Sequence, residues 1–395
     1  MKKKIAFIIN FNPDKWLGGM HVIKNLIFCI KKFSNNNIKA VLVVKKNLTK
    51  EELKMFEGLT ILKTNFFYNE SLIKKIYNKL SVILLGKSND YEKFFSKEKI
   101  DFVSHINVFS TNLVFGKKSL VKSLSFIPDL QHIHLKQNFS FQKIIMRNLN
   151  IFLCGLYSSK ILLSGSHAKK DIKKISKTAH KKSVLSKFIF KCPEKKDISN
   201  IATLKKIYKF DTPYFYLPNQ YWVHKNHEVV LKALSYIKHK FSLKKILIIS
   251  SGNNEDYRNP NYIQKIKCYI SKNNLKDYYH YIGVIPFKDV LSLMYHSIAV
   301  INPSKFEGRS STVEQAKCMG KKIILSNIPV HKEQKPRYSK YFGVDNFKKL
   351  AHILMIENNE YNNNINLDYN DILKKNNQDL LNYYKAYIKI LSDYK

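Results

Sequence analysis

The chain has 395 residues, which is more than one hydrophobic core usually organises, so two domains are expected. Hydrophobic residues make up 45% of it, which excludes an intrinsically disordered protein. The 69 basic and 29 acidic residues give a formal net charge of +40. Such a surplus attracts nucleic acid, acidic membranes or phosphorylated substrates, although AT-rich coding DNA, which favours Lys, Asn and Ile, yields the same composition without selection.

Several classes of protein are disfavoured by the absence of their sequence signatures. There is no zinc-finger spacing, basic-region heptad or aromatic RNA-binding signature, so no nucleic-acid partner is expected. The apolar run at the N-terminus, Ile5–Ile9, is too short for a signal peptide, and the apolar region 151–163 is interrupted by Ser158, Ser159 and Lys160. The cysteines form no C-x-x-C pair, which is typical of reduced thiols: Cys29, Cys154, Cys192, Cys268 and Cys318. We therefore predict a cytoplasmic protein, either soluble or peripheral on the inner face of the cell membrane.

In the first half of the chain, short apolar runs alternate with longer amphipathic stretches such as His21–Phe33. This alternation predicts a parallel sheet covered by helices. The expected strands are Ile5–Ile9, Ala40–Val44, Thr60–Leu62, Phe102–Val103, Ser123–Ile127 and Ile161–Ser164. We assign residues 1–195 to this first α/β domain.

The pattern lapses after Lys191, and residues 196–212 are predicted to be a linker. The alternation then restarts and predicts a second α/β domain over residues 213–375. Its expected strands are Tyr214–Leu217, Lys245–Ser250, His280–Ile282, Ile298–Ile301 and Ile323–Leu325. Residues 376–395 are predicted to form an amphipathic C-terminal helix that packs back on the first domain. In open α/β sheets, ligands bind beyond the carboxyl ends of the strands, so a cleft between the two domains is the expected active site.

The stretch PSKFEGRSSTVEQAKCMGKKIILSNIPVHKEQ follows the predicted strand 298–301. Ser311-Thr-Val-Glu314 fits a capping box that opens a helix, which would make Glu314 a helix cap. A helix N-terminus also suits a phosphate group, and a neighbouring carboxylate can accept hydrogen bonds from both ribose hydroxyls. The small side chains of Ser310, Ser311 and Thr312 would let a diphosphate approach closely. The residues by themselves leave both roles of Glu314 open.

This stretch resembles the nucleotide-sugar site of retaining glycosyltransferases of family 4 (glycosyl transferases group 1), and in particular of the members that build bacterial surface polysaccharides. The resemblance implies a GT-B fold, in which two Rossmann-like parallel-sheet domains face each other across a cleft. It also implies that Glu307 holds the hydroxyls of the donor sugar and Glu314 those of the ribose. The two glutamates are one residue closer together than is usual in the family, so the turn through Gly308 must be tighter. Arg309 stands where the family often has an aromatic residue; contact with a phosphate and exposure to solvent both remain open.

A second stretch, YFYLPNQYWVHKNHEVVLKAL from Tyr214 to Leu234, also resembles the family. In that family, the corresponding loop carries an Arg and a Lys that neutralise the donor diphosphate. Lys225 matches the Lys, and Gln220 stands at the place of the Arg, where it can donate a hydrogen bond but adds no charge. We expect His224 and His227, which flank Lys225, to be structural or solvent-facing.

The first half offers candidates for the other side of the reaction. Gly18 and Gly19 open the first predicted helix and permit close approach of the backbone to a ligand. Members of the family have a similar Gly-Gly loop near the donor phosphates, so the resemblance implies that both glycines bind the nucleotide sugar. An ordinary β-to-α turn remains the alternative. The segment SFIPDLQHIHLKQNFS resembles the family loop that brings a His or Asp near the reacting sugar carbon, which makes Asp129 and His132 the candidates, with His134 a poorer one. A structural turn at Asp129 after Pro128 remains an alternative.

The resemblance implies a metal-independent, hexosyltransferase-like glycosyltransferase that needs no cofactor besides its nucleotide-diphosphate-sugar donor. No D-x-D motif is present. The expected acceptor is a glycan or a lipid-linked glycan in the synthesis of lipopolysaccharide O-antigen or capsule, at an anionic membrane surface. Two alternatives stay open: a nucleotide-sugar epimerase with the GT-B fold, and a non-enzymatic basic protein that binds polyanions.

Overall fold

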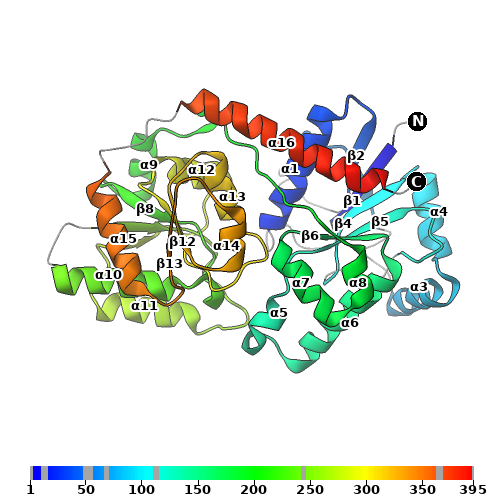
Figure 1. The fold of residues 1–395 in the computed structure, drawn as a ribbon, viewed down its shortest axis with the longest axis horizontal. Helices are drawn as coiled ribbons and strands as arrows, with labels where there is room; N and C mark the ends of the chain where they lie inside the picture. The colour runs from blue at the N-terminus through cyan, green and yellow to red at the C-terminus, as the bar shows by residue number, and fades with distance from the viewer. Residues whose placement is uncertain are drawn as a thin grey trace. The chain divides into compact units, whose positions relative to one another are not determined.

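The computed structural model describes residues 3–9, 17–47, 57–65, 71–109, 115–241, 246–361 and 368–393. The chain divides into two compact units (Figure 1). The first unit comprises Met1–Ile189 together with Asp379–Lys395, and the second comprises Phe190–Gln378. Each unit has its own sheet and its own hydrophobic core.

The first unit is built on a parallel sheet with strand order β3-β2-β1-β4-β5-β6-β7 among the described residues. Its strands are β1 (Lys3–Ile8), β2 (Ile38–Lys45), β3 (Ile61–Thr64), β4 (Phe102–Asn107), β5 (Lys122–Ile127), β6 (Lys160–Leu163) and β7 (Ser183–Leu185). Its helices are α1 (Leu17–Phe33), α3 (Leu72–Leu85), α4 (Asn89–Lys97), α5 (Gln131–His134), η2 (Lys136–Asn138), α6 (Phe141–Tyr157), α7 (Ser166–Ile175) and α8 (Lys177–Lys182). The central strands β1, β4 and β5 are buried along most of their length, as expected where helices cover both faces of a parallel sheet.

The second unit repeats this plan with strand order β10-β9-β8-β11-β12-β13, again parallel. Its strands are β8 (Tyr214–Leu217), β9 (Leu247–Ser250), β10 (Tyr279–Tyr281), β11 (Val300–Asn302), β12 (Ile323–Ser326) and β13 (Ser339–Phe342). Its helices are η3 (Lys195–Asp197), α9 (Ile201–Tyr208), η4 (Val223–Lys225), α10 (His227–Phe241), α11 (Tyr262–Lys272), α12 (Phe287–His296), α13 (Ser311–Cys318), α14 (Pro329–Gln334) and α15 (Phe347–Asn359).

One core of the second unit joins alternate residues of the strands to three helices. Phe215 and Ile248 from the strands pack in one buried cluster with apolar side chains of α10, α11 and α15. Figure 1 shows α10 and α11 side by side along one side of this sheet. Strand residues of opposite parity, such as Tyr216 and Ile249, are equally buried. Both faces of the sheet are therefore covered, which leaves the strand ends as the place for polar chemistry.

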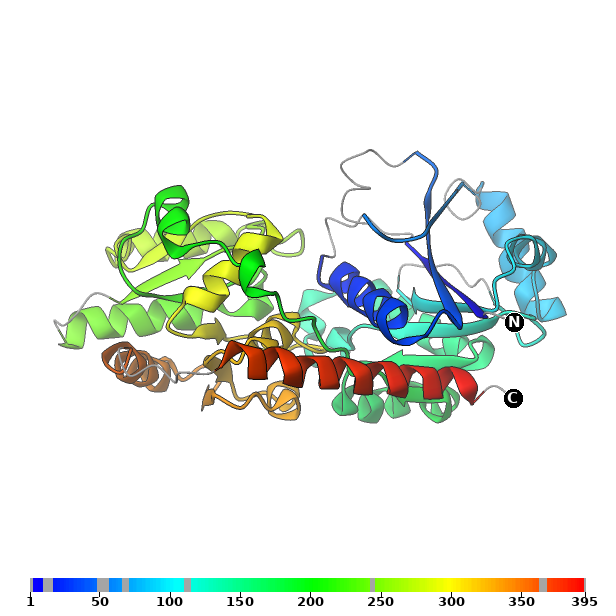
Figure 2. The same cartoon turned by 90° about the horizontal axis from the view of Figure 1, so that it is seen from above.

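The last helix, α16 (Tyr369–Ser392), is unbroken in Figure 2 and contributes residues to both units. Its C-terminal part belongs to the first unit, where the Tyr387 hydroxyl lies 2.8 Å from Ser104 Oγ of β4. The helix begins at Tyr369, seven residues before the predicted start at residue 376. The predicted linker 196–212 contains α9 and lies within the second unit.

Candidate active site

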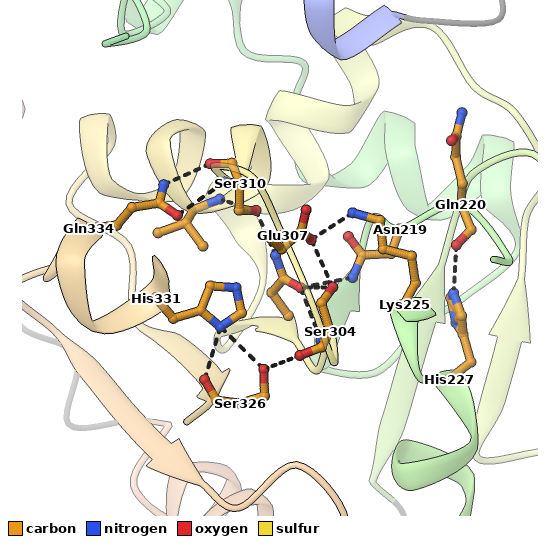
Figure 3. A network of polar contacts seen from close by, with 12 residues as sticks. Asn219, Gln220, Lys225, His227, Ser304, Glu307, Ser310, Ser326, His331 and Gln334 are labelled. Atoms are coloured by element: carbon orange, nitrogen blue, oxygen red, sulfur yellow. Dashed lines mark hydrogen bonds and ion pairs between the residues drawn. The ribbon is translucent and has the colours of Figure 1, made fainter. Parts of the chain in front are cut away.

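The carboxyl ends of β8 and β11 lie next to each other, and their side chains are joined by hydrogen bonds. Asn219 Nδ2 donates to Asn302 Oδ1 over 3.3 Å, and Asn302 Nδ2 donates to Ser310 Oγ over 2.7 Å. The Ser304 hydroxyl lies 2.8 Å from both Asn302 Oδ1 and Glu307 Oε1. These contacts fix the two loops that carry the predicted donor-site residues (Figure 3).

Lys225 and Glu307 form an ion pair at this edge of the sheet, with 2.6 Å between Nζ and Oε1. Asn226, in the left-handed region at a φ of 58°, positions Lys225 because its amide donates to the carbonyl oxygens of Pro303 and Val344. Burial by itself raises the pKa of Glu307. The charge of Lys225 and its hydrogen bond outweigh burial, with His224 and His331 adding to them, so the pKa lies below the usual 4.5. Glu307 is therefore ionised at neutral pH.

Helix α13 begins one residue earlier than the capping box predicts. Ser310 is the N-cap, and its Oγ accepts the hydrogen bond of Val313 N–H. Ser311 and Thr312 are the first two helical residues, and Glu314 follows Val313 inside the helix. The capping role considered for Glu314 is therefore wrong, because the serine that caps the helix lies one position too early to form the box.

The Glu314 carboxylate is instead held by two donors from other segments. Arg309 Nη2 lies 2.5 Å from Glu314 Oε1, and the side chains of Arg309 and Glu314 are only 3% and 1% exposed. Gln334 Nε2 donates to the same oxygen over 2.9 Å. Of the two roles open for Arg309, exposure to solvent is wrong, because its guanidinium is buried against a carboxylate.

Gln334 fixes the start of α13 from the far end of α14. Its Oε1 accepts the Ser310 N–H over 3.1 Å, and its Nε2 donates to the Ser310 carbonyl oxygen over 2.8 Å. A single side-chain amide thus binds both backbone groups of the N-cap residue (Figure 3) and also the Glu314 carboxylate. This role could not be predicted from the sequence, because a glutamine near a helix end is usually a surface residue.

Two buried histidines lie close to the ion pair. His331 Nδ1 donates to the Ser326 carbonyl oxygen over 2.9 Å, and burial lowers its pKa to about 4 although Glu307 opposes this shift. Its Nε2 is buried and accepts no hydrogen bond from the residues that the structure describes. His227 stacks on Tyr221 at 4.0 Å, and burial lowers its pKa to about 3. Both rings are neutral at pH 7; His227 is thus structural, as expected from the sequence.

The remaining predicted residues of the second unit surround this pair of loops. Gly308 lies half-buried in the turn between Glu307 and Arg309, and Thr312 is buried. The Gln220 carbonyl oxygen lies 3.1 Å from His227 Nε2, while its side-chain amide points away from Lys225 in Figure 3.

In the first unit, Asp129 and His132 each have a structural partner. Asp129 Oδ1 lies 3.0 Å from Arg147 Nη2 and accepts the Gln131 N–H over 3.1 Å, which is the turn contact that the sequence left open. His132 Nε2 lies 3.0 Å from Asn148 Oδ1, and burial lowers the pKa of His132. The poorer candidate, His134, lies 2.6 Å from Asp171. Asp129 and His132 both follow the carboxyl end of β5, as predicted from the sequence.

The predicted glycine pair lies in the first turn of α1, where Gly19 is buried and Gly18 half-buried. Within the described parts of the chain, no group of three or more His, Cys, Asp or Glu side chains could hold a metal ion.

Comparison with known proteins matches residues 201–338 to the family model of glycosyl transferases group 1. This segment contains Lys225, Glu307 and Glu314. A comparison with curated proteins gave no significant match.

Solved structures extend the likeness to both units. Anabaena Alr3699/HepE, solved with UDP and glucose, superimposes with a TM-score of 0.69 over 99% of both chains at 13% identity. The lipopolysaccharide outer core galactosyltransferase WaaB superimposes with a TM-score of 0.58 over 99% of both chains at 16% identity. The UDP-GlcNAc 2-epimerase of Methanocaldococcus jannaschii superimposes with a TM-score of 0.52 at 14% identity, over 89% of this chain and 92% of the epimerase chain. The chain therefore has the GT-B fold with two Rossmann-like units, as predicted.

Proposed function

We propose that this protein transfers a sugar from a nucleotide-diphosphate sugar to a glycan or lipid-linked acceptor with retention of anomeric configuration. The observation that carries the proposal is the arrangement of Lys225, Glu307 and Glu314 at the carboxyl ends of β8 and β11, inside the segment that matches glycosyl transferases group 1. Neighbouring structures bind UDP and UDP-glucose, so a UDP-hexose is the first donor to test.

Glu314 would bind the ribose of the donor. Its Oε1 already accepts hydrogen bonds from Arg309 and Gln334, whereas its Oε2 accepts none from the described residues. In the proposed complex a ribose hydroxyl would donate to Oε2 while Arg309 and Gln334 keep the carboxylate in place. Because the Glu314 side chain is only 1% exposed, the nucleotide would have to displace neighbouring groups to reach it. Because both of these donors are buried, the carboxylate is preorganised for the ribose before the nucleotide arrives.

The diphosphate would lie against the N-terminus of α13 and the Lys225 ammonium. The N–H groups of Ser311 and Thr312 precede the intrahelical hydrogen-bond ladder and suit a phosphate oxygen. Lys225 adds a positive charge where the leaving diphosphate becomes more negative, which stabilises the transition state. Lys225 would exchange part of its contact with Glu307 for the phosphate, and this would leave Glu307 to accept hydrogen bonds from the sugar.

The reaction breaks the bond between the anomeric carbon and the phosphate oxygen and forms a bond from that carbon to the acceptor oxygen. The proton of the acceptor hydroxyl passes to the departing phosphate on the same face of the sugar. No strongly basic side chain is then required, which agrees with the structural partners of Asp129 and His132. We assign these two residues to the acceptor side, and Gly18 and Gly19 to the donor phosphates; no metal or cofactor is assigned.

We place the reaction in the synthesis of a surface polysaccharide on the cytoplasmic side of the membrane. Two features support this placement: the structural likeness to a lipopolysaccharide galactosyltransferase and the basic surplus of the chain. A radiolabelled UDP-hexose supplied with lipid-linked acceptors would give an acceptor-dependent product. An epimerase would change the donor sugar without any acceptor.

The deciding experiment is calorimetric titration of the protein with UDP, GDP, ADP and CMP. We expect one nucleotide to bind, and Glu314→Ala to abolish the signal. Glu228→Ala is the matched control, because Glu228 is a partly exposed carboxylate of the same unit that pairs with Lys265. If no nucleotide binds to the folded protein, or if Glu314→Ala binds as tightly as the unchanged chain, the donor-site assignment is wrong.

A further inference from the structure

Helix α3 in the first unit buries its polar side and exposes its apolar side. Asn78, Ser81 and Val82 are buried, and Asn78 Oδ1 accepts a hydrogen bond from Ser88 Oγ. Ile73 is 81% exposed and Leu84 is 76% exposed. Among the described side chains of this helix, the exposed apolar stripe comprises Ile73, Ile76, Tyr77, Leu80, Ile83, Leu84 and Leu85. A helix on the surface of a soluble protein has the reverse arrangement.

Helix α6 in the same unit carries a second exposed apolar stripe. Ile151, Cys154 and Gly155 are buried against the unit. Phe141 at the first turn is 77% exposed. The stripe comprises Phe141, Ile145, Met146, Leu149 and Phe152, whose spacing places them along one side of a helix. Figure 1 draws α3 and α6 along the lower edge of the first unit. We call the two stripes together the α3–α6 surface.

The α3–α6 surface is positively charged. Neither helix contains an acidic residue, whereas α3 carries three lysines and α6 carries Lys143. Arg147 of α6 does not add to this charge, because it is paired with Asp129 and its side chain is only 18% exposed. Lys74 and Lys79 of α3 are exposed, and Lys74 lies 3.6 Å from Asp90 of α4. A large exposed apolar area with basic residues on the same helices is unusual for a monomer in water and indicates an interaction surface.

We infer that the α3–α6 surface binds the headgroup and upper acyl region of an anionic lipid bilayer. Apolar side chains with lysines beside them match such a bilayer, because the side chains enter the interface while the cations meet acidic headgroups. A second copy of the chain fits less well, since a symmetric contact would bring like charges together. None of the described helices is long and apolar enough to cross a membrane, so the helices would lie in the interface.

This surface is a separate inference from glycosyl transfer, because binding to vesicles needs neither donor nor acceptor. It gives a defined location to the membrane contact that the overall charge predicts. If both proposals hold, the unit assigned to the acceptor is the one that touches the membrane.

The test is flotation of the full chain with vesicles of phosphatidylcholine alone or with about a third phosphatidylglycerol. We expect binding to the anionic vesicles, weakened by salt, and at least about tenfold weaker binding for Ile76→Ser/Leu80→Ser/Leu84→Ser and for Phe141→Ser/Ile145→Ser/Phe152→Ser. Ile207→Ser/Tyr257→Ser/Val284→Ser is the matched control, because it removes three exposed apolar side chains from the second unit. The control is expected to bind like the unchanged chain.

Several results would overturn the inference: no binding of the unchanged chain to anionic vesicles, equal binding of all variants, or a dimer in light scattering that the α3 variant converts to a monomer. A second measurement avoids dependence on the triple variants. An environment-sensitive fluorophore on Leu84→Cys, in a Cys268→Ser background, is expected to shift its emission to the blue on addition of anionic vesicles. The same fluorophore on Val284→Cys is expected not to shift, and equal behaviour of the two labels would contradict the assignment.

Discussion

The buried ion pair between Arg309 and Glu314 offers the sharpest test of the candidate site. Replacing Arg309 by Met leaves a carboxylate almost without solvent and held only by Gln334. Replacing Glu314 by Gln leaves a buried guanidinium without its counter-charge. Removing one partner of a buried pair costs about 3–5 kcal/mol, mostly because the other charge stays buried. The double variant Arg309→Met/Glu314→Gln leaves neither charge, so it should cost clearly less than the sum of the two single variants.

The coupling energy is measured by urea unfolding of all four proteins. The chain has two tryptophans, Trp16 and Trp222, and Trp222 belongs to the second unit. In a Trp16→Phe background, tryptophan fluorescence therefore follows that unit, even if the two units unfold separately.

We expect a coupling of at least about 2 kcal/mol for the buried pair. The exposed pair of Lys265 and Glu228, with side chains 68% and 30% exposed, is the control and should give less than about 1 kcal/mol. A coupling for Arg309 and Glu314 no larger than that of the control would refute the burial of this pair and, with it, the preorganisation of Glu314.

Three further predictions concern the same unit. Lys225→Met should weaken the binding of a nucleoside diphosphate at least about tenfold in calorimetry but leave the binding of the nucleoside unchanged, because in the proposed complex the lost charge would face phosphate; equal losses of affinity would contradict this role. Gln334→Leu should lower the free energy of unfolding by about 2–4 kcal/mol, since it leaves the backbone of Ser310 without its partners; a neutral result would contradict the contact. His227 and His331, with pKa values of about 3 and about 4, should destabilise the unit as pH falls below 6.5, because the unfolded chain binds more protons there. Urea midpoints that stay constant from pH 7 to pH 4.5 would show that these rings are not buried.

The presence of two parallel sheets could be predicted from the sequence, because the strands of a buried parallel sheet are mostly apolar on both faces. Among the described strands, β7 and β13 are the two that were not predicted from the sequence. They are edge strands of three and four residues. In β13, SKYF, only Phe342 is buried, so the strand lacks the apolar run that identifies its neighbours. Polar residues on such an edge also limit pairing with other chains, which explains why edge strands differ from the central pattern.

Lys225 and Glu307 could be singled out because they stand in two stretches that resemble one family, and the folded chain brings their side chains together. Other residues of the candidate site could not be predicted from the sequence, because their roles depend on the hydrogen bonds that they make in the folded chain. Gln334 binds the backbone of Ser310 from 24 positions away, and Ser304 joins Asn302 to Glu307. Amides and hydroxyls carry no charge pattern, and their role depends on which buried groups they can reach once the chain has folded.

Arg309 shows how such geometry changes the electrostatics of the whole site. With its guanidinium on Glu314, and with Lys225 on Glu307, each acid at the strand ends has its own cation. In the proposed donor complex, the diphosphate would therefore not meet two unpaired carboxylates. It would meet a region close to neutral, together with the N-terminus of α13, whose dipole favours an anion. On this proposal the two glutamates would accept hydrogen bonds from hydroxyl groups without repelling the phosphates beside them, which explains how a phosphate site could contain two acids.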